Sequence, residues 1–231
     1  MQALKLKYPN FIYIIRGYHE DRNVNEINGL GYECAIRLFE DISEKNSIFN
    51  LINDVFNLLP FGVLVDNSML FISGGVGSSI ETLNQINNIK RPCSLNPGIE
   101  NMEQFIPYDL LWSEYHDEVE NFDVNFSKDL THKAFAVKYG KKRLNDFLNN
   151  NGLNLLITAN QFIKEGFCTY NDDKILMLFS ASNYLDQYEN IGGMIIIGKK
   201  NKNKRLNIVP KLINVCKDKK NMFRKEKDKN L

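Results

Sequence analysis

A glycine-dense loop is the first feature of this sequence that suggests chemistry. Ser73-Gly74-Gly75-Val76-Gly77 follows the apolar run Met69–Ile72. A glycine-rich loop after a strand can hold phosphate through its backbone N–H groups, but this one lacks the Lys-Ser or Lys-Thr pair at P-loop spacing. A tight turn after a strand is the favoured interpretation, and phosphate binding is the alternative.

Histidine and acidic side chains are the other residues that could bind a metal ion. His116 and His132 lie in an acidic stretch without helical or strand periodicity, where solvated surface histidines are more common than ligands. Asp117, Glu118 and Glu120 could attract a cation, although a solvated acidic face is favoured. The four cysteines lie far apart, without a CxxC pair, and indicate reduced thiols of an intracellular protein rather than a zinc site.

The charge of the chain is unevenly distributed. The 231 residues are 43% hydrophobic and 25% charged, which predicts one folded domain, and the formal net charge is only +1. Residues 199–231 hold 13 Lys and Arg against 3 Asp and Glu, whereas residues 1–198 hold 16 against 25. The net charge near zero is therefore the sum of an acidic body, residues 1–198, and a basic tail, residues 199–231.

The basic tail has several interpretations. It could contact nucleic acid, an acidic membrane surface or an acidic partner, or act as a nuclear localisation signal. A partly disordered, solubilising end is favoured, with 206–209 and 212–215 extending the fold. Because no apolar run approaches the length of a membrane helix and no signal peptide is recognisable, we expect a cytoplasmic location, with a nuclear one as alternative.

Apolar spacing predicts alternating helices and strands in the first half of the chain and mainly strands later. The predicted helices cover residues 26–40, 46–58, 80–89 and 140–150. The predicted strands cover residues 11–15, 62–66, 69–72, 153–157, 174–179 and 193–197. Residues 109–112 read as a short turn and 114–129 as irregular. This order predicts an α/β sandwich whose loops at the strand ends carry any site.

A series of short motifs runs through the chain. In order they are Arg16–Glu20, Leu59-Pro60, Ser73–Gly75, Arg91-Pro92, Asp109–Ser113, Thr158–Gln161 and Phe179–Tyr184. In residue types and order they resemble the motifs of the PPP family of serine/threonine protein phosphatases, within the calcineurin-like metallophosphoesterase superfamily, which has RGNHE at the first of these places, HGG at the third, RAHQ at the sixth and FSAPNY at the last. The resemblance implies a phosphatase-like domain over 1–198, followed by the basic tail 199–231. It also implies a β-sandwich flanked by helices, here lacking the family's first strands, and a centre of two divalent metal ions (Mn, Fe or Zn).

The resemblance predicts a degenerate metal centre. Three of the family's six metal ligands lie in GDxHG and GDxVDRG, and neither motif occurs in this chain. The other three ligand positions fall on Tyr18, Ser73 and Asn160. A phenol with a pKa of about 10 and a neutral hydroxyl are poor metal ligands, and an amide oxygen lacks the nitrogen of imidazole. We therefore expect no metal cofactor in this chain.

Other site positions are partly retained. His19 matches the family histidine that protonates the leaving alcohol, while its orienting Asp belongs to the absent GDxVDRG motif. Arg16 and Glu20 match residues that support the loop, Tyr184 matches a tyrosine at the rim of the site, and Lys133 falls at a phosphate-binding Arg position. Lysine at this position keeps the positive charge of arginine but cannot form arginine's pair of parallel hydrogen bonds to a phosphate.

The resemblance implies a serine/threonine phosphatase-like protein that is a catalytically inactive pseudophosphatase or a fragment, because loss of one charge-stabilising donor alone costs about 10²–10³ in rate. One alternative is a working phosphatase whose N-terminal motifs are encoded upstream. Another is an adaptor or binding module that uses the basic tail.

The expected partners are a phosphoprotein or regulatory subunit and an acidic partner for the tail. Without the first strands, unpaired strand edges would expose backbone and apolar surface and favour aggregation.

Overall fold

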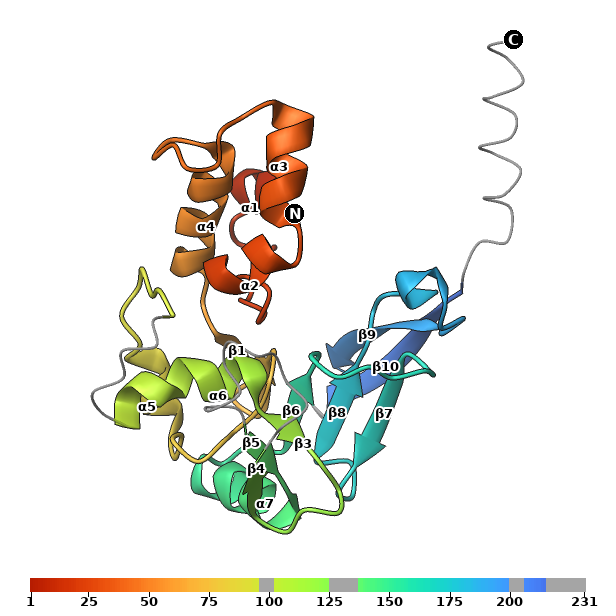
Figure 1. Ribbon diagram of the computed structural model, residues 1–231. Coiled ribbons are helices and arrows are strands. Elements are labelled where there is room, and N and C mark those ends of the chain that lie inside the picture. Colours follow the sequence, from red (N-terminus) through yellow and green to blue (C-terminus); the bar gives the residue numbers. More distant parts are fainter. Residues whose placement is uncertain (96–101, 125–136, 200–205, 215–231) are drawn as a thin grey trace. The chain divides into compact units, whose positions relative to one another are not determined.

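The structure is a computed structural model that describes residues 1–95, 102–124, 137–199 and 206–214 (Figure 1). The chain divides into two compact units. The first consists of Met1–Gln161 and Thr169–Leu176, and the second of Phe162–Cys168 and Met177–Leu231. None of the helices in the described ranges is long and apolar enough to cross a membrane.

Four helices open the first unit: α1 (Gln2–Lys7), α2 (Arg22–Ile27), α3 (Leu30–Leu38) and α4 (Ile48–Leu58). The single helix predicted over 26–40 is divided in two, because Gly29 adopts the left-handed conformation with φ 97° and ends the first segment. The Asp21 side chain caps α2 by accepting hydrogen bonds from the N–H groups of Asn23 and Val24. The helix predicted over 46–58 is confirmed as α4, which buries Phe49 and begins at the cap Ser47.

A five-stranded sheet has the order β1-β2-β6-β8-β7. Its strands are β1 (Gly62–Val65), β2 (Met69–Ile72), β6 (Leu155–Thr158), β7 (Phe167–Tyr170) and β8 (Ile175–Leu178), of which β7 and β8 contribute residues to both units. β1 and β2 form an antiparallel hairpin, and β2 pairs with β6 in parallel. The predicted hairpin is therefore confirmed, with Asp66 and Asn67 in the left-handed region at its turn. The mixture of parallel and antiparallel pairing confirms the predicted α/β class.

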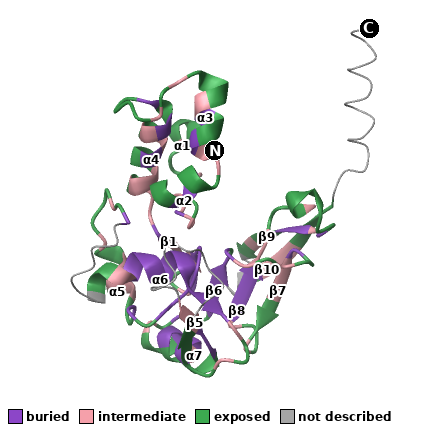
Figure 2. Cartoon of the chain, in the orientation of Figure 1, coloured by how far each residue is buried: buried purple, intermediate pink, exposed green. Residues whose placement is uncertain are grey.

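The rest of the first unit includes a helix, α6 (Ile106–Trp112), whose residues are all buried (Figure 2). The other elements here are α5 (Leu83–Asn87), the 3₁₀ turn η1 (Met102–Phe105), α7 (Lys141–Asn150), and a three-stranded sheet of β3 (Glu114–Tyr115), β5 (Val137–Tyr139) and β4 (Phe122–Val124). Two predictions are corrected here. The expected turn over 109–112 is the end of α6, and the stretch expected to be irregular contains β3 and β4.

The second unit contains β9 (Gly192–Lys199) and β10 (Leu206–Ile213), which pair antiparallel, and the 3₁₀ turn η2 (Tyr184–Asp186). The strand predicted over 193–197 is confirmed within β9. β10 lies within the basic tail, so regular structure extends beyond Lys199.

The buried strand predicted over 11–15 is wrong. These residues form neither helix nor strand, and Phe11 and Tyr13 are exposed. A strand is defined by hydrogen bonds to a neighbouring strand, and no described segment pairs with this one. The apolar run alone could not reveal the lack of a partner.

Candidate functional site

The loop Arg16–Glu20 is anchored by its first residue. The Arg16 side chain is completely buried and donates hydrogen bonds to the carbonyl oxygens of Cys93 (2.5 Å) and Glu20 (2.8 Å) and to Asn57 Oδ1 (3.3 Å). Its guanidinium also lies 4.0 Å from the buried carboxylate of Asp21. Arg16 is therefore a positioning residue that ties the loop to two distant parts of the chain.

The last residue of the loop closes it. Glu20 Oε2 accepts a hydrogen bond of 2.9 Å from the Gly17 N–H, and the Glu20 N–H donates to the Gly17 carbonyl. A Cβ atom at Gly17 would lie 2.5 Å from Glu20 Oε2, so glycine permits this close approach. In this chain Arg16 and Glu20 hold the loop through these contacts, and their role in a phosphatase-like site stays a prediction.

A cavity of about 440 Å³ brings the motif loops of the first unit together. It is lined by Arg16–Glu20, by Ser73 at the end of β2 and by Ala159 after β6, with the apolar side chains of Ile14, Ile15, Phe56 and Leu59 on its walls. The Ala159 N–H donates to the Ser73 carbonyl at 3.0 Å, which joins the two strand ends. Sequence motifs far apart in the chain therefore meet at one place.

The three expected ligand positions make contacts within the protein. The Tyr18 ring packs between two other rings, with its centroid 4.3 Å from that of His19 and 4.8 Å from that of Trp112. Asn160 is buried, and its Nδ2 donates to the Ser113 carbonyl at 3.3 Å. Ser73 is also buried. His19, by contrast, is exposed at the cavity.

The glycine-dense loop is bound to helix α6. The N–H groups of Gly74 and Gly75 donate to the carbonyl oxygens of Leu110 (2.7 Å) and Asp109 (3.2 Å). A Cβ atom would lie 2.5 Å from the Leu111 backbone at Gly74 and 1.9 Å from Asp109 Oδ1 at Gly77. The backbone N–H groups of Gly74 and Gly75 already have acceptors, which favours the tight-turn interpretation over a phosphate-binding loop.

Sequence reasoning assigned no role to two residues that hold this region. The Asp109 carboxylate is buried and accepts hydrogen bonds from Ser79 N (2.8 Å), Ser79 Oγ (2.6 Å) and Ser113 Oγ (2.9 Å). Arg143 of α7 donates to the carbonyl oxygens of Val76 (3.1 Å) and Gly77 (2.9 Å). Apart from Ser113, which is four residues from Asp109, their partners lie 30 to 67 residues away in sequence, so no local pattern could have indicated those pairs.

The chain matches the calcineurin-like phosphoesterase family over residues 1–159. It belongs to this family. The serine/threonine-protein phosphatase BSL2 of Arabidopsis thaliana is 33% identical over 211 residues, which are 91% of this chain and 19% of that protein. A protein serine/threonine phosphatase structure from Saccharomyces cerevisiae, with similarity to human phosphatase PP5, matches with a TM-score of 0.73 at 25% identity, covering 93% of this chain and 64% of the yeast chain. The chain thus spans only part of the length of both relatives.

Calcineurin-like phosphoesterases use divalent metal ions, and the described residues do not fit such a centre. Tyr18, Ser73 and Asn160 offer a phenol, a hydroxyl and an amide in place of carboxylates and imidazoles, and the Tyr18 ring packs against Trp112. Within the described ranges, no three His, Cys, Asp or Glu side chains are grouped so that they could hold a metal ion. The described side chains at these three positions therefore do not fit the family's metal centre.

Of two further expected positions, one belongs to the second unit and one falls outside the described residues. Tyr184 belongs to the second unit, where its ring packs with those of Phe162, Phe179 and Tyr188 and its N–H donates to Asn190 Oδ1 at 2.7 Å. Lys133 and His132 lie outside the described residues. The expected role of Lys133 in phosphate binding stays a prediction.

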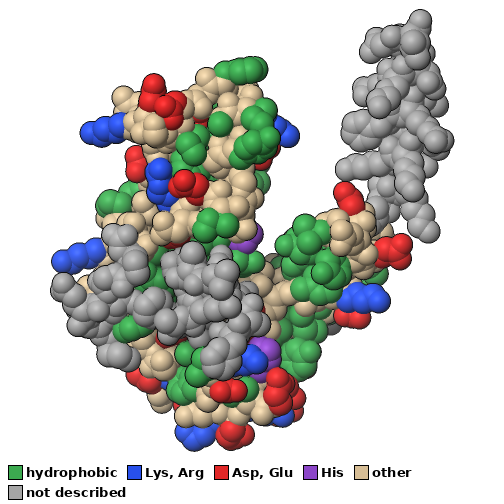
Figure 3. All heavy atoms as spheres, in the orientation of Figure 1, with side chains coloured by type: hydrophobic (Ala, Val, Ile, Leu, Met, Phe, Trp, Pro, Cys, Tyr) green, Lys and Arg blue, Asp and Glu red, His purple; other side chains and the backbone are tan. Residues whose placement is uncertain are grey.

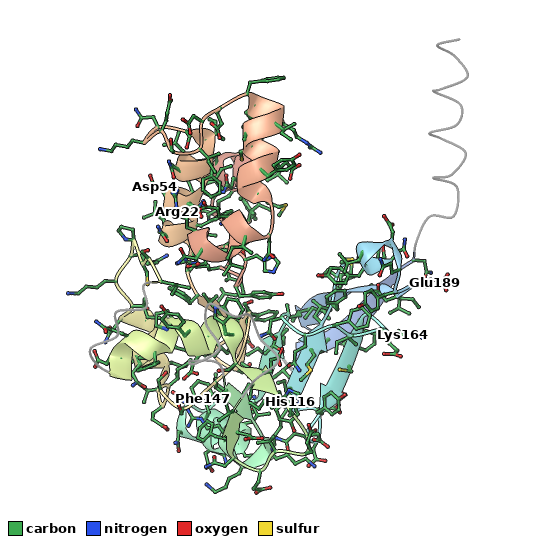
Figure 4. All side chains as sticks on the ribbon, viewed as in Figure 1. Arg22, Asp54, His116, Phe147, Lys164 and Glu189 are labelled. Carbon is green, nitrogen blue, oxygen red and sulfur yellow. The ribbon has the colours of Figure 1, made fainter. Side chains whose placement is uncertain are left out.

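His116 differs from the solvated histidine that the sequence predicts (Figure 4). Its side chain is 24% exposed and lies between two carboxylates, with Nε2 3.5 Å from Glu114 Oε2 and Nδ1 3.1 Å from Glu118 Oε1. Glu114, more than any other group, raises the pKa of His116 above its ordinary value of 6.5, and Glu118 adds to this effect.

We expect the protonated His116 to stabilise the fold. Because the folded-state pKa of His116 is raised, its stabilisation is fully present below pH 6.5 and is lost as the pH rises through the folded-state pKa. Urea unfolding of the wild type and His116→Gln should show a larger loss of stability toward about pH 8 in the wild type. An equal pH dependence in both proteins would contradict the assignment.

Proposed function

We propose that this chain is a serine/threonine phosphatase-like protein that does not hydrolyse phosphate monoesters and serves as a binding module. The observation that carries the proposal is the packing of Tyr18 at a family metal-ligand position. Its ring contacts Trp112 and His19, so the phenol fills the place where the family resemblance expects a compact amide ligand.

The chemistry of the family supports this proposal. Two metal ions about 3.5–4 Å apart generate the nucleophile from water and stabilise the transferring phosphoryl group. Losing a single charge-stabilising donor costs about 10²–10³ in rate. Here all three of the family ligand positions present in the chain carry other residues, so the expected loss is much larger than that of one donor.

His19 alone does not restore the reaction. As a general acid it would protonate a leaving alcohol, which contributes about 10²–10⁴-fold where the histidine is held in one orientation and tautomer. The Tyr18 ring meets the His19 ring edge-on at 4.3 Å, and the Asp that orients this histidine in the family belongs to GDxVDRG, a motif that does not occur in this sequence. The proposed partner is a phosphoprotein or a regulatory subunit that recognises the phosphatase-like surface without being dephosphorylated.

A hydrolysis assay tests the proposal. The purified chain, supplied with Mn²⁺ and an aryl phosphate, should show no turnover above that of His19→Ala. The exposed position of His19 makes His19→Ala a variant that leaves the core intact. Turnover that requires Mn²⁺ and disappears in His19→Ala would overturn the proposal.

A second candidate is a working phosphatase in which a longer polypeptide supplies the remaining metal ligands. It is favoured by the intact support of the loop through Arg16 and Glu20, and by the partial coverage of the yeast phosphatase, 64% of that chain. A transcript that encodes GDxHG and GDxVDRG in frame, whose product hydrolyses the aryl phosphate with Mn²⁺, would establish this candidate. If that product is inactive, the binding module stands.

A further inference from the structure

The triplet Asn-Gly-Leu occurs twice in the sequence, beginning at Asn28 and at Asn151. In both places the asparagine follows the last residue of a helix, α2 or α7, with φ −80° and ψ 10° at Asn28 and φ −106° and ψ 4° at Asn151. The glycines that follow, Gly29 and Gly152, both lie in the left-handed region, with φ 97° and 63°. The two triplets therefore have matching sequences and nearly matching backbones.

An asparagine followed by glycine can lose its side-chain amide by reacting with its own backbone. The nitrogen of the glycine attacks the Cγ atom of the asparagine, and a residue without a Cβ atom leaves room for this attack. In both triplets a Cβ atom at the glycine would have nothing within 4 Å. Each glycine N–H donates a long hydrogen bond of 3.3 Å, from Gly29 to the Glu26 carbonyl and from Gly152 to the Asn149 carbonyl. The backbone thus gives neither triplet an advantage.

The side chains of the two asparagines differ. Asn151 Oδ1 accepts a hydrogen bond of 2.8 Å from the Leu83 N–H. Its Nδ2 donates to the carbonyl oxygens of Phe147 (2.8 Å) and Glu81 (3.0 Å). The Asn28 side chain is exposed and takes part in no hydrogen bond among the described residues. With ψ near 0°, either asparagine must rotate about its Cα–C bond before Cγ meets the glycine nitrogen, and Asn151 must in addition give up three side-chain hydrogen bonds.

We propose that Asn28 is a modification site that deamidates through a cyclic imide with Gly29, while Asn151 is protected. In the first step the Gly29 nitrogen bonds to Asn28 Cγ, the Cγ–Nδ2 bond breaks, and ammonia leaves with the proton that the Gly29 nitrogen gives up. Water then opens the imide at either carbonyl carbon and restores the N–H of Gly29, which gives aspartate or isoaspartate. The net reaction consumes water and releases ammonia, and nothing is oxidised or reduced. This inference goes beyond the proposed binding function and does not depend on it.

The modification changes the end of helix α2. A carboxylate at position 28 places a negative charge beside the last carbonyl groups of this helix, where negative charge is unfavourable. Isoaspartate also lengthens the main chain between α2 and α3 by one methylene group. Charged side chains of both signs already lie on the surface of the N-terminal helices in Figure 3. Helix α2 begins at the cap Asp21, which lies 4.0 Å from Arg16, so the modified helix is one that contacts the anchor of the site loop.

Peptide mapping by mass spectrometry of the full chain, after storage in warm, mildly alkaline buffer, tests the proposal. Conversion of amide to acid should accumulate at Asn28, and the three hydrogen bonds of Asn151 should make its conversion slower by about tenfold or more. The matched control is the chain unfolded in guanidinium chloride, where both triplets lose their contacts and should convert at similar rates. The variant Asn28→Gln keeps an amide but cannot close the same imide ring, so it should show no comparable conversion at this position.

Three outcomes would overturn the proposal. They are equal conversion of both asparagines in the folded chain, no conversion of Asn28 in the folded chain while the unfolded chain converts, or the same difference between the two asparagines in folded and unfolded chains. The last result would assign the difference to the neighbouring sequence rather than to the hydrogen bonds of Asn151. Mass spectrometry reads all three outcomes without any measurement of activity, so they are distinguishable from the outcome of the hydrolysis assay.

Discussion

Replacing Arg16 by methionine is expected to lower the free energy of unfolding by about 3–5 kcal/mol, which is the usual cost of removing one partner of a buried ion pair. The change removes the donors to Cys93, Glu20 and Asn57 and leaves the carboxylate of Asp21, which is 3% exposed, without its cation. Methionine preserves much of the side-chain volume, so the loss reports on polar contacts rather than on a cavity.

Urea unfolding at neutral pH measures this effect, and Arg37→Met is the matched control. Arg37 forms an exposed ion pair with Glu33 at 3.0 Å on α3, and such pairs contribute only about 0–1 kcal/mol. A loss for Arg16→Met no larger than that for Arg37→Met would show that Arg16 does not anchor the loop. If the prediction holds, the retained arginine is explained by folding alone, without any catalytic role.

Asp109→Ala is expected to destabilise the chain by about 3 kcal/mol, because it leaves the N–H and hydroxyl of Ser79 and the hydroxyl of Ser113 without their acceptor in a buried site. Asp109→Asn keeps one carbonyl oxygen for Ser79, and the Ser113 hydroxyl can rotate to accept from the amide. We expect Asp109→Asn to cost about 1 kcal/mol or less.

The sign of the pH dependence gives a second readout for this site. Burial raises the pKa of Asp109 above its ordinary value of 3.8, against the hydrogen bonds of Ser79 and Ser113 and the charge of Arg143, which lower it. The stability that protonated Asp109 contributes is therefore present below pH 3.8 and is lost as the pH rises through the folded-state pKa. The variant Asp109→Asn should therefore show no such loss of stability with rising pH.

Asp146→Ala is the control for this measurement. It breaks an exposed pair of 3.0 Å with Lys142 and should change neither the stability nor its pH dependence appreciably. Equal destabilisation by the alanine and asparagine variants at Asp109 would contradict this account.

Local patterns in the sequence predicted the elements that depend on local interactions. Helix α4 followed from its apolar spacing and the hairpin β1-β2 from two apolar runs around a turn. The end of α6 was read as a turn because its apolar residues are buried on all sides and show no helical stripe. The strand predicted over 11–15 failed because pairing is a non-local property.

The candidate site was only partly accessible to sequence reasoning. The order of the motifs predicted that Arg16–Glu20 and the end of β2 belong to one site, and the structure places both at one cavity. The contact between Tyr18 and Trp112 joins residues far apart in the chain, and no spacing rule indicates it. The same holds for Arg143, whose buried guanidinium fixes the loop of Val76 and Gly77.

Titration of the full chain with Mn²⁺, with the heat of binding measured by calorimetry, tests the central claim that the family metal centre is lost. We expect no saturable binding, because the aligned ligand positions offer a phenol whose ring packs against Trp112, a hydroxyl and an amide in place of carboxylates and imidazoles. The variant Tyr18→Phe removes the only phenol oxygen at these positions and should behave like the wild type. Saturable binding of two metal ions per chain, weakened in Tyr18→Phe or Asn160→Ala, would contradict the claim.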